Sequence, residues 1–256
     1  MSTRTLDGWR LAVGTLTVFR VAPPQRVDRD TARTAALLAP VAFAPAAVLA
    51  AGAAGLLAMV VPGTVAALLA VGLVAWLTRA IHLDGLADTA DGLGSGRPAP
   101  RALEIMRRGD VGPMGVVTLV VVLGLQVASA AVLLERGWGW LAVALALCAG
   151  RGALVIAARR GVPAARPDGL GTVFASSVPL AAGATLWAVL AVPLALGAWL
   201  AGASWWLGPL AAAVGAALAW YLVRAATRRL GGITGDVLGA AVEVATTGVL
   251  IVLAAG

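Results

Sequence analysis

Residues 82–92 read His82-Leu83-Asp84-Gly85-Leu86-Ala87-Asp88-Thr89-Ala90-Asp91-Gly92, in a chain that is otherwise mostly Ala, Leu, Val and Gly. Asp84, Asp88 and Asp91 are spaced i, i+4 and i+7, which predicts that they share one face of a helix. Like charges at this spacing destabilise a bare helix. A divalent cation, alone or with a phosphate, would remove the repulsion, and Mg²⁺ prefers such oxygen ligands. The stretch therefore predicts a metal–phosphate site; a solvated helix end is the alternative.

The composition indicates a membrane protein. Of 256 residues, 61% are hydrophobic and 12% are charged, whereas soluble domains are about 25% charged. Apolar stretches of about 20 residues recur, which is the length of a transmembrane helix. They show no alternation of polarity, so a helical bundle rather than a spanning barrel is expected. We predict an all-α fold, a polytopic integral membrane bundle that forms a single domain over 1–256.

About seven transmembrane helices are expected. Pro40 and Pro45 are expected to kink or break the first half of the first span. Residues 6–20, within an N-terminal segment 1–34, have the pattern of an interfacial amphipathic helix or of a first packed element. Three further segments, 84–112, 158–177 and 224–236, are predicted to be loops that together form the site. The expected spans cover about 35–61, 64–83, 113–134, 137–157, 178–200, 204–223 and 237–255.

The distribution of arginine predicts the orientation in the membrane. All 19 basic residues are Arg, and every one except Arg136 falls in the N-terminal segment, the three loops or the adjoining span ends. By the positive-inside rule that side is cytoplasmic, so the N-terminus is expected inside and the C-terminus outside. Trp138, Trp140, Trp199, Trp205 and Trp206 gather at the opposite span ends, as an aromatic belt would. This asymmetry accounts for the basic charge without nucleic acid.

Several polar residues outside the acidic motif are site candidates. Arg107 and Arg108 are suited to hold phosphate oxygens, or alternatively only enforce topology. Arg151 lies within a predicted span, so it should be paired, line a cavity or snorkel to the interface. Glu243, about two turns into the last span, is costly there unless it meets a cation. His82, the single histidine, is either structural or a general base or substrate contact.

Residues 228–236 predict a phosphate cradle. They read Arg228-Arg229-Leu230-Gly231-Gly232-Ile233-Thr234-Gly235-Asp236 and end where the last span begins. A helix N-terminus favours an anion, and glycine lets a phosphate approach the backbone. A loop–helix junction needs glycine in any case, so the motif is weak alone. Asp236 and Glu243 stand at i and i+7, on one face of the last span.

These motifs together resemble one family, cobalamin synthase, also called adenosylcobinamide-GDP ribazoletransferase. The resemblance covers almost the whole chain and keeps the order of the family's motifs. The segments that carry it are 82–92, Leu103-Glu104-Ile105-Met106-Arg107, Gly150-Arg151, Gly169-Leu170-Gly171 with Phe174, and 230–240 with Glu243. There are departures: Leu83 stands where many members have Glu, Arg108-Gly109-Asp110 where many have Asp-Ser-Arg, and Thr246 where an acidic residue is common.

The resemblance implies a reaction and a location. A ribose hydroxyl of α-ribazole, or of its 5′-phosphate, would attack the cobinamide-side phosphorus of adenosylcobinamide-GDP, and GMP would leave. The cofactor would be Mg²⁺ and the location the lipid bilayer of a bacterial inner membrane, with the site facing the cytoplasm. The oligomeric state stays open, a homo-oligomer included.

The hypothesis for the site divides the candidates by charge. Asp84, Asp88 and Asp91 would hold Mg²⁺ against the diphosphate, and Asp236 and Glu243 would complete the metal site or orient the hydroxyl. His82 completes the catalytic candidates. The substrate-binding candidates are Arg107, Arg151, Arg228, Arg229, Gly232, Thr234 and Gly235.

Other classes share part of this pattern. Another membrane transferase that uses aspartates and Mg²⁺ on a diphosphate, such as a CDP-alcohol phosphotransferase or an aromatic prenyltransferase, is the nearest alternative. The CDP-alcohol pattern has Ala-Arg after Asp-Gly, whereas Leu86-Ala87-Asp88 follows here. A transporter would place carboxylates near the middle of the membrane in repeated halves, and here they cluster at one side.

Overall fold

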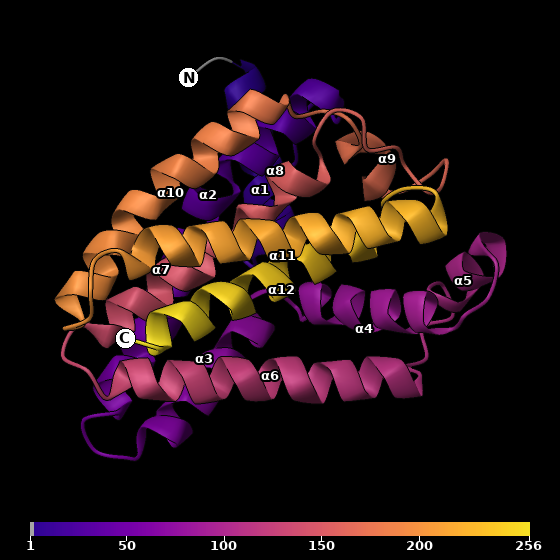
Figure 1. Ribbon diagram of the computed structural model, residues 1–256. Coiled ribbons are helices and arrows are strands. Elements are labelled where there is room, and N and C mark those ends of the chain that lie inside the picture. Colours follow the sequence, from indigo (N-terminus) through magenta and orange to yellow (C-terminus); the bar gives the residue numbers. More distant parts are fainter. Residues whose placement is uncertain (1–2) are drawn as a thin grey trace.

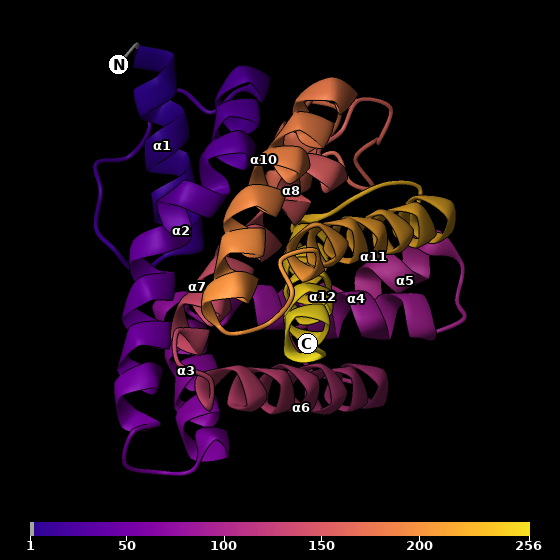
Figure 2. The ribbon, with the colours of Figure 1, turned by 60° about the vertical axis from the view of Figure 1, so that its left-hand side comes forward.

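The computed structural model describes residues 3–256, and within them the protein is a bundle of helices (Figures 1 and 2). The only β-type pairings in that range are two isolated bridges, Arg159 with Val178 and Ala164 with Ile233. In chain order the helices are α1 Thr3–Leu16, α2 Arg29–Leu57, α3 Gly63–Leu77, α4 Ile81–Gly94, α5 Ala99–Ile105, α6 Pro113–Leu134, α7 Gly139–Arg151, α8 Ala153–Ala157, α9 Leu170–Phe174, α10 Leu180–Leu200, α11 Leu207–Leu230 and α12 Gly235–Ala254.

The helix lengths confirm the all-α polytopic membrane fold. Six segments in the described range are long and apolar enough to cross a membrane: α2, α6, the α7–α8 segment 139–157, α10, α11 and α12. The pair α3 and α4 makes a seventh crossing if it is counted as one span, broken by a bend of 91°. α12 is the central helix, because it packs against α4, α6, α7 and α11.

The second span, expected over about 64–83, is interrupted in the structure. α3 ends at Leu77, and Arg79 and Ala80 both take a left-handed conformation with φ of 55°. Two successive residues in that region interrupt the i→i−4 hydrogen bonds of a helix. The guanidinium of Arg79 donates to the carbonyl of Gly14 in α1, which holds the bend in place. The acidic motif consequently forms a helix of its own, α4, rather than the start of a loop over 84–112.

The two prolines of the first span were expected to kink or break its first half. α2 continues as one helix from Arg29 to Leu57 through both Pro40 and Pro45, so neither proline breaks it, and a kink stays a prediction. Asp28 caps its first turn by accepting from the Thr31 N–H at 2.9 Å. α1 packs along α2 so closely that a Cβ added at Gly8 would lie 2.5 Å from the Thr34 side chain. α1 is therefore a packed element of the bundle.

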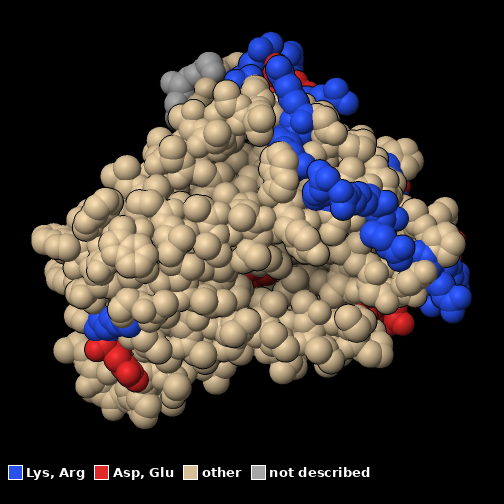
Figure 3. Space-filling model, viewed as in Figure 1, with Lys and Arg blue, Asp and Glu red and all other residues tan. Residues whose placement is uncertain are grey.

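The two ends of the bundle carry different side chains. Basic groups form a band along the upper and right-hand margins of the face drawn in Figure 3. We call this end, which holds the start of α2, the 158–169 loop and the end of α11, the arginine-rich end. At the opposite end Arg136 donates to the carbonyls of Leu253 and Ala254 at the end of α12. Exposed Trp138 and Trp199 belong to the turns and span ends of that opposite side.

Candidate active site

The site is organised by a close crossing of α4 and α12. A Cβ added at Gly85 would lie 2.7 Å from the backbone oxygen of Asp236 and 2.9 Å from its Cα. Further along the crossing, a Cβ at Gly239 would lie 3.1 Å from the Cα of His82. Small residues let membrane helices approach closely. The glycines of the two motifs therefore bring Asp84 and Asp88 next to the first turn of α12, where Asp236 stands.

Asp84 and Asp88 are carboxylates without partners. Asp84 is exposed and Asp88 is half-buried on the same face of α4. Within residues 3–256 neither side chain accepts a hydrogen bond or forms an ion pair within 4 Å; Asp88 instead experiences the negative charges of Asp236, Asp84 and Asp91. The positive charge of Arg166 acts on Asp88 in the opposite direction. Such a group of like charges favours a bound cation.

Asp91 has a different environment, although it lies on the same helix. Its two carboxylate oxygens accept the N–H groups of Gly112, at 2.7 Å, and Gly115, at 2.9 Å. These are free donors at the N-terminus of α6, where an acidic group is stabilising. The structure thus gives Asp91 a structural partner, and a third metal ligand at this position stays a prediction.

Arg166, which sequence reasoning did not select, completes the acidic group. It comes from the loop between α8 and α9, and its Nη1 lies 3.6 Å from Asp236 Oδ2. Its Nη2 donates to the Leu103 carbonyl at 2.7 Å, while its buried Nε has no partner in the described chain. Burial lowers the pKa of Arg166, and the charge of Asp236 opposes that shift. The only signal in the sequence was its place three residues before Gly169-Leu170-Gly171.

The glycine-rich segment 231–235, which precedes α12, holds the loop between α8 and α9 in place. Gly231 ends α11 with φ of 83°, a conformation that favours glycine. Ile233 N–H then donates to the Pro163 carbonyl at 2.9 Å, and Ala165 N–H donates to the Ile233 carbonyl at 2.9 Å. A Cβ on Gly232 would lie 2.4 Å from the Pro163 oxygen. Gly232 therefore serves the packing of the 163–165 backbone, and its part in a phosphate cradle stays a prediction.

Thr234 and Gly235 lead into the acidic group. The Thr234 hydroxyl accepts from the Val237 N–H at 3.3 Å, as an N-cap does, and donates to Asp236 Oδ2 at 3.1 Å. It therefore orients the carboxylate of Asp236. Gly235 is half-buried at the start of α12.

The other predicted arginines occupy the margin of the site. Arg107 Nη2 donates to both oxygens of Asp168, at 2.7 and 2.9 Å, and both residues are exposed. Arg108, Arg228 and Arg229 are also exposed. No ion pair within the described range includes Arg228 or Arg229. The guanidinium groups of Arg108, Arg228 and Arg229 are exposed at the arginine-rich end, and that of Arg107 is held there by the exposed Asp168.

His82, Arg151 and Glu243 form a separate group inside the bundle. His82 Nδ1 lies 4.0 Å from Glu243 Oε1, and Gln126 donates to the other Glu243 oxygen at 2.8 Å. Arg151 is 0% exposed, lies with its Cζ 3.5 Å from the centroid of the Phe43 ring, and donates to its own helix at Leu147. Its Nε and Nη2 have no hydrogen-bond partner in the described chain, and the side chain lines a small internal cavity together with Gln126 and Glu243. This agrees with the expectation of a cavity-lining Arg151 and not with a side chain that snorkels to the interface. A phosphate contact of Arg151 stays a prediction.

The carboxylates at the α4–α12 crossing fit a metal ion that a substrate also coordinates. No group of three or more His, Cys, Asp or Glu side chains in residues 3–256 is placed to hold an ion by itself. Mg²⁺ in enzyme sites commonly takes one or two carboxylates together with substrate phosphates and water. The unpartnered Asp84 and Asp88 fit that mode, in which the substrate supplies part of the coordination.

The fold and the site define a class: a polytopic helical membrane protein whose partner-free aspartates and surrounding arginines suit a metal-bound diphosphate. Comparison with known proteins narrows the class. A family model described as cobalamin-5-phosphate synthase matches residues 8–254, and the chain belongs to this family.

Curated relatives are similar to this chain over most of its length. An adenosylcobinamide-GDP ribazoletransferase of Nocardioides sp. is 48% identical over 255 residues, which cover 97% of this chain and 99% of the relative. One from Frankia casuarinae is 36% identical and covers 96% of this chain and 93% of its own. One from Bradyrhizobium diazoefficiens is 43% identical over 74% of this chain and 70% of its own. No solved structure matches the chain.

Proposed function

We propose that this protein is the membrane transferase that joins α-ribazole, or its 5′-phosphate, to adenosylcobinamide-GDP with release of GMP, a late step in cobalamin biosynthesis. The family membership and the names of the relatives support the reaction. The observation that carries the site assignment is the meeting of Asp84, Asp88 and Asp236 at the α4–α12 crossing, with Arg166 beside them.

The reaction is a displacement at phosphorus. A new bond forms between the ribose oxygen of the acceptor and the cobinamide-side phosphorus, the bond to GMP breaks, and the hydroxyl proton is released to the leaving GMP phosphate or to water. Catalysis of this type depends on positioning and on neutralising charge. Mg²⁺, when bound, supplies charge neutralisation on the diphosphate. Asp84 and Asp88 would hold it.

The cations and Asp236 would act on the substrates directly. Within the described residues Arg166 has an unpaired Nε, and Arg107 donates to the exposed Asp168, so both would be available to diphosphate oxygens. Asp236, oriented by Thr234, would position the attacking hydroxyl. His82 and Glu243 lie deeper, and we assign them to the support of α4 from α12. The arginine distribution supports a site that faces the cytoplasm from a bacterial inner membrane.

The test is a defined assay with purified protein in liposomes, adenosylcobinamide-GDP, α-ribazole phosphate and Mg²⁺. GMP release and corrinoid product are followed for wild type, Asp84→Asn and Asp88→Asn. We expect each variant to lose roughly 100-fold or more of the rate, because each substitution removes a charge that would bind the metal. Chelation of Mg²⁺ should abolish the wild-type rate.

A matched control is Asp30→Asn, which removes an exposed carboxylate on α2 whose partner is Arg4. This variant should keep the wild-type rate. Full activity in both Asp84→Asn and Asp88→Asn would agree with the proposed reaction but contradict the assignment of these two residues as metal ligands. No product from folded, lipid-supplied wild type would contradict the proposed function and favour another diphosphate substrate.

A further inference from the structure

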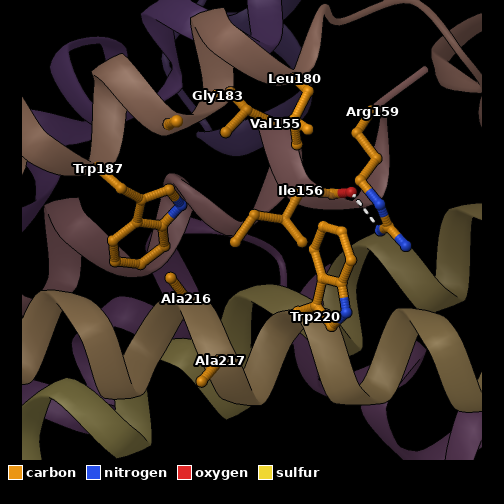
Figure 4. A pocket seen from close by; sticks show the side chains of 10 residues that line it. Val155, Ile156, Arg159, Leu180, Gly183, Trp187, Ala216, Ala217 and Trp220 are labelled. Carbon is orange, nitrogen blue, oxygen red and sulfur yellow. Dashed lines mark hydrogen bonds between the residues drawn. The ribbon is translucent and has the colours of Figure 1, made fainter.

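A lateral groove between α10 and α11 is not part of the site described above. Val155 and Ile156 of α8 line it together with residues of the two longer helices, and its volume is about 310 Å³. Figure 4 shows Trp187 and Trp220 on its two sides, with Ile156 between them. Leu180 and Trp220 are exposed at its edge, so the groove opens on the outer surface of the bundle. Apart from Arg159, the lining is made of apolar and small residues.

The mouth of the groove carries two cations without acidic partners. Arg159 lies with its Cζ 3.8 Å from the centroid of the Trp220 ring, and its Nη1 donates to the Ile156 carbonyl at 2.9 Å. Arg224, one helical turn after Trp220, acts on Arg159 as a like charge, and burial together with this charge lowers the pKa of Arg159. No carboxylate in the described residues forms an ion pair with either arginine.

Deeper in the groove there is a hydrogen-bond donor without an acceptor. Trp187 is 7% exposed, lines the groove, and its Nε1–H has no partner among the described residues. A buried indole N–H normally finds an acceptor. The groove therefore offers two positive charges at its mouth, an apolar interior and one buried donor.

We propose that this groove binds one anionic phospholipid, with the phosphate at Arg159 and Arg224, an acyl chain between α10 and α11, and an ester carbonyl accepting from Trp187. A lipid-facing groove with unpaired cations at the interface matches a lipid of opposite charge. The two arginines belong to the arginine-rich end, so the lipid comes from the leaflet on that side. A second copy of the chain would leave the two cations unneutralised unless it brought a carboxylate.

The first experiment measures lipid retention by native mass spectrometry on delipidated protein in detergent. Phosphatidylglycerol and phosphatidylcholine with the same acyl chains are titrated onto wild type, Arg159→Gln, Ala217→Leu and Arg26→Gln. Wild type should retain one phosphatidylglycerol roughly tenfold more strongly than phosphatidylcholine, since each nearby arginine contributes to binding an anionic lipid. Arg159→Gln should remove most of this preference. Ala217→Leu, at an exposed position that lines the groove, should weaken retention of both lipids.

Arg26→Gln is the charge-matched control, because Arg26 is exposed in the α1–α2 loop and should not affect retention. Equal retention of the two lipids by wild type would overturn the proposed anionic ligand. If both Arg159→Gln and Ala217→Leu retained phosphatidylglycerol as strongly as wild type, the result would overturn the groove as the binding site. A dimer that is lost in Ala217→Leu, with no change in retained lipid, would overturn the proposal in favour of self-association.

A second experiment tests the buried donor. Trp187→Phe keeps an aromatic side chain, smaller than the indole, and removes the N–H, so it should weaken retention of ester-linked phosphatidylglycerol by roughly 2- to 10-fold. Ether-linked phosphatidylglycerol has no carbonyl, and its retention should be the same in wild type and Trp187→Phe. An equal loss for both lipids would contradict the assigned hydrogen bond, because it would reflect packing alone.

Discussion

Asp88 and Asp91 stand less than one helical turn apart on α4 and have opposite surroundings. Asp88 has three negative neighbours, and no hydrogen-bond donor within residues 3–256 reaches it. Asp91 accepts two backbone N–H groups from the start of α6. The i, i+4, i+7 spacing correctly predicted a shared helix, but it could not show that one oxygen pair is taken by a segment more than twenty residues later. The place of Arg166 in the site was not predictable for the same reason, because its partners Asp236 and Leu103 are distant in sequence.

This contrast gives a stability prediction at the residue scale. Asp91→Ala should lower the free energy of unfolding by about 1–3 kcal/mol, because it leaves two N–H groups at the start of α6 without acceptors. Asp88→Asn should leave the unfolding free energy unchanged or raise it by about 0.5 kcal/mol, since it removes a like charge. Denaturant unfolding in mixed micelles measures both. Asp110→Asn, an exposed carboxylate between α5 and α6, is the control; equal losses in Asp88→Asn and Asp91→Ala would contradict the division of roles.

At the scale of elements, the site depends on how closely α4 and α12 approach. Hydropathy predicted the number of long apolar helices, because twenty-residue apolar segments have few alternatives in lipid. It did not give all of their bounds: α2 covers Arg29–Leu57 instead of about 35–61, and α11 continues to Leu230, into the predicted loop 224–236. It missed the bend between α3 and α4, since Arg79 and Ala80 are not residues that favour the left-handed region. The bend is held by a contact with Gly14 of α1, which no local pattern contains. Likewise, no local pattern gave a role to Gly85 and Gly239, which permit the close approach of α4 and α12, nor to the packing of Gly232 against the 163–165 backbone.

The crossing can be tested through Gly85. In Gly85→Ala the new Cβ would meet the Asp236 backbone at 2.7 Å, and backbone cannot rotate away as a side chain can. We expect a loss of about 1–3 kcal/mol in stability and roughly 100-fold in activity, because small displacements of catalytic groups are costly. The transferase assay and unfolding in micelles measure these effects.

Gly52→Ala is the matched control for that variant. A Cβ at Gly52 meets nothing within 4 Å, and alanine favours a helix over glycine by about 1 kcal/mol. Gly52→Ala should therefore be neutral or stabilising. Wild-type activity in Gly85→Ala would show that the close approach of α4 to α12 is not what positions the carboxylates.

At the scale of the whole molecule, the two ends of the bundle differ in charge. The sequence predicts every arginine but Arg136 on one side, and on the face drawn in Figure 3 the basic groups form a band at the arginine-rich end, while Arg151 is buried inside the bundle. Arg136 satisfies the last carbonyls of α12 at the other end. The overall arrangement was predictable because charge asymmetry and hydropathy act on whole segments. The division of the polar residues into an open acidic site and a buried group around Arg151 was not predictable. It depends on which helices face one another in the bundle.

The direction of insertion follows from this asymmetry and can be measured with single cysteines. In a Cys148→Ala background, we place one cysteine in the exposed α6–α7 turn with Gly137→Cys and one in the exposed α4–α5 loop with Arg97→Cys. A membrane-impermeant thiol reagent should label Gly137→Cys in intact cells, because the positive-inside rule puts that turn outside. Arg97→Cys should react only after the membrane is opened. The reverse pattern would place Asp84, Asp88 and Asp236 on the outer face, away from cytoplasmic Mg²⁺ and substrates, and would contradict the proposed function as well as the orientation.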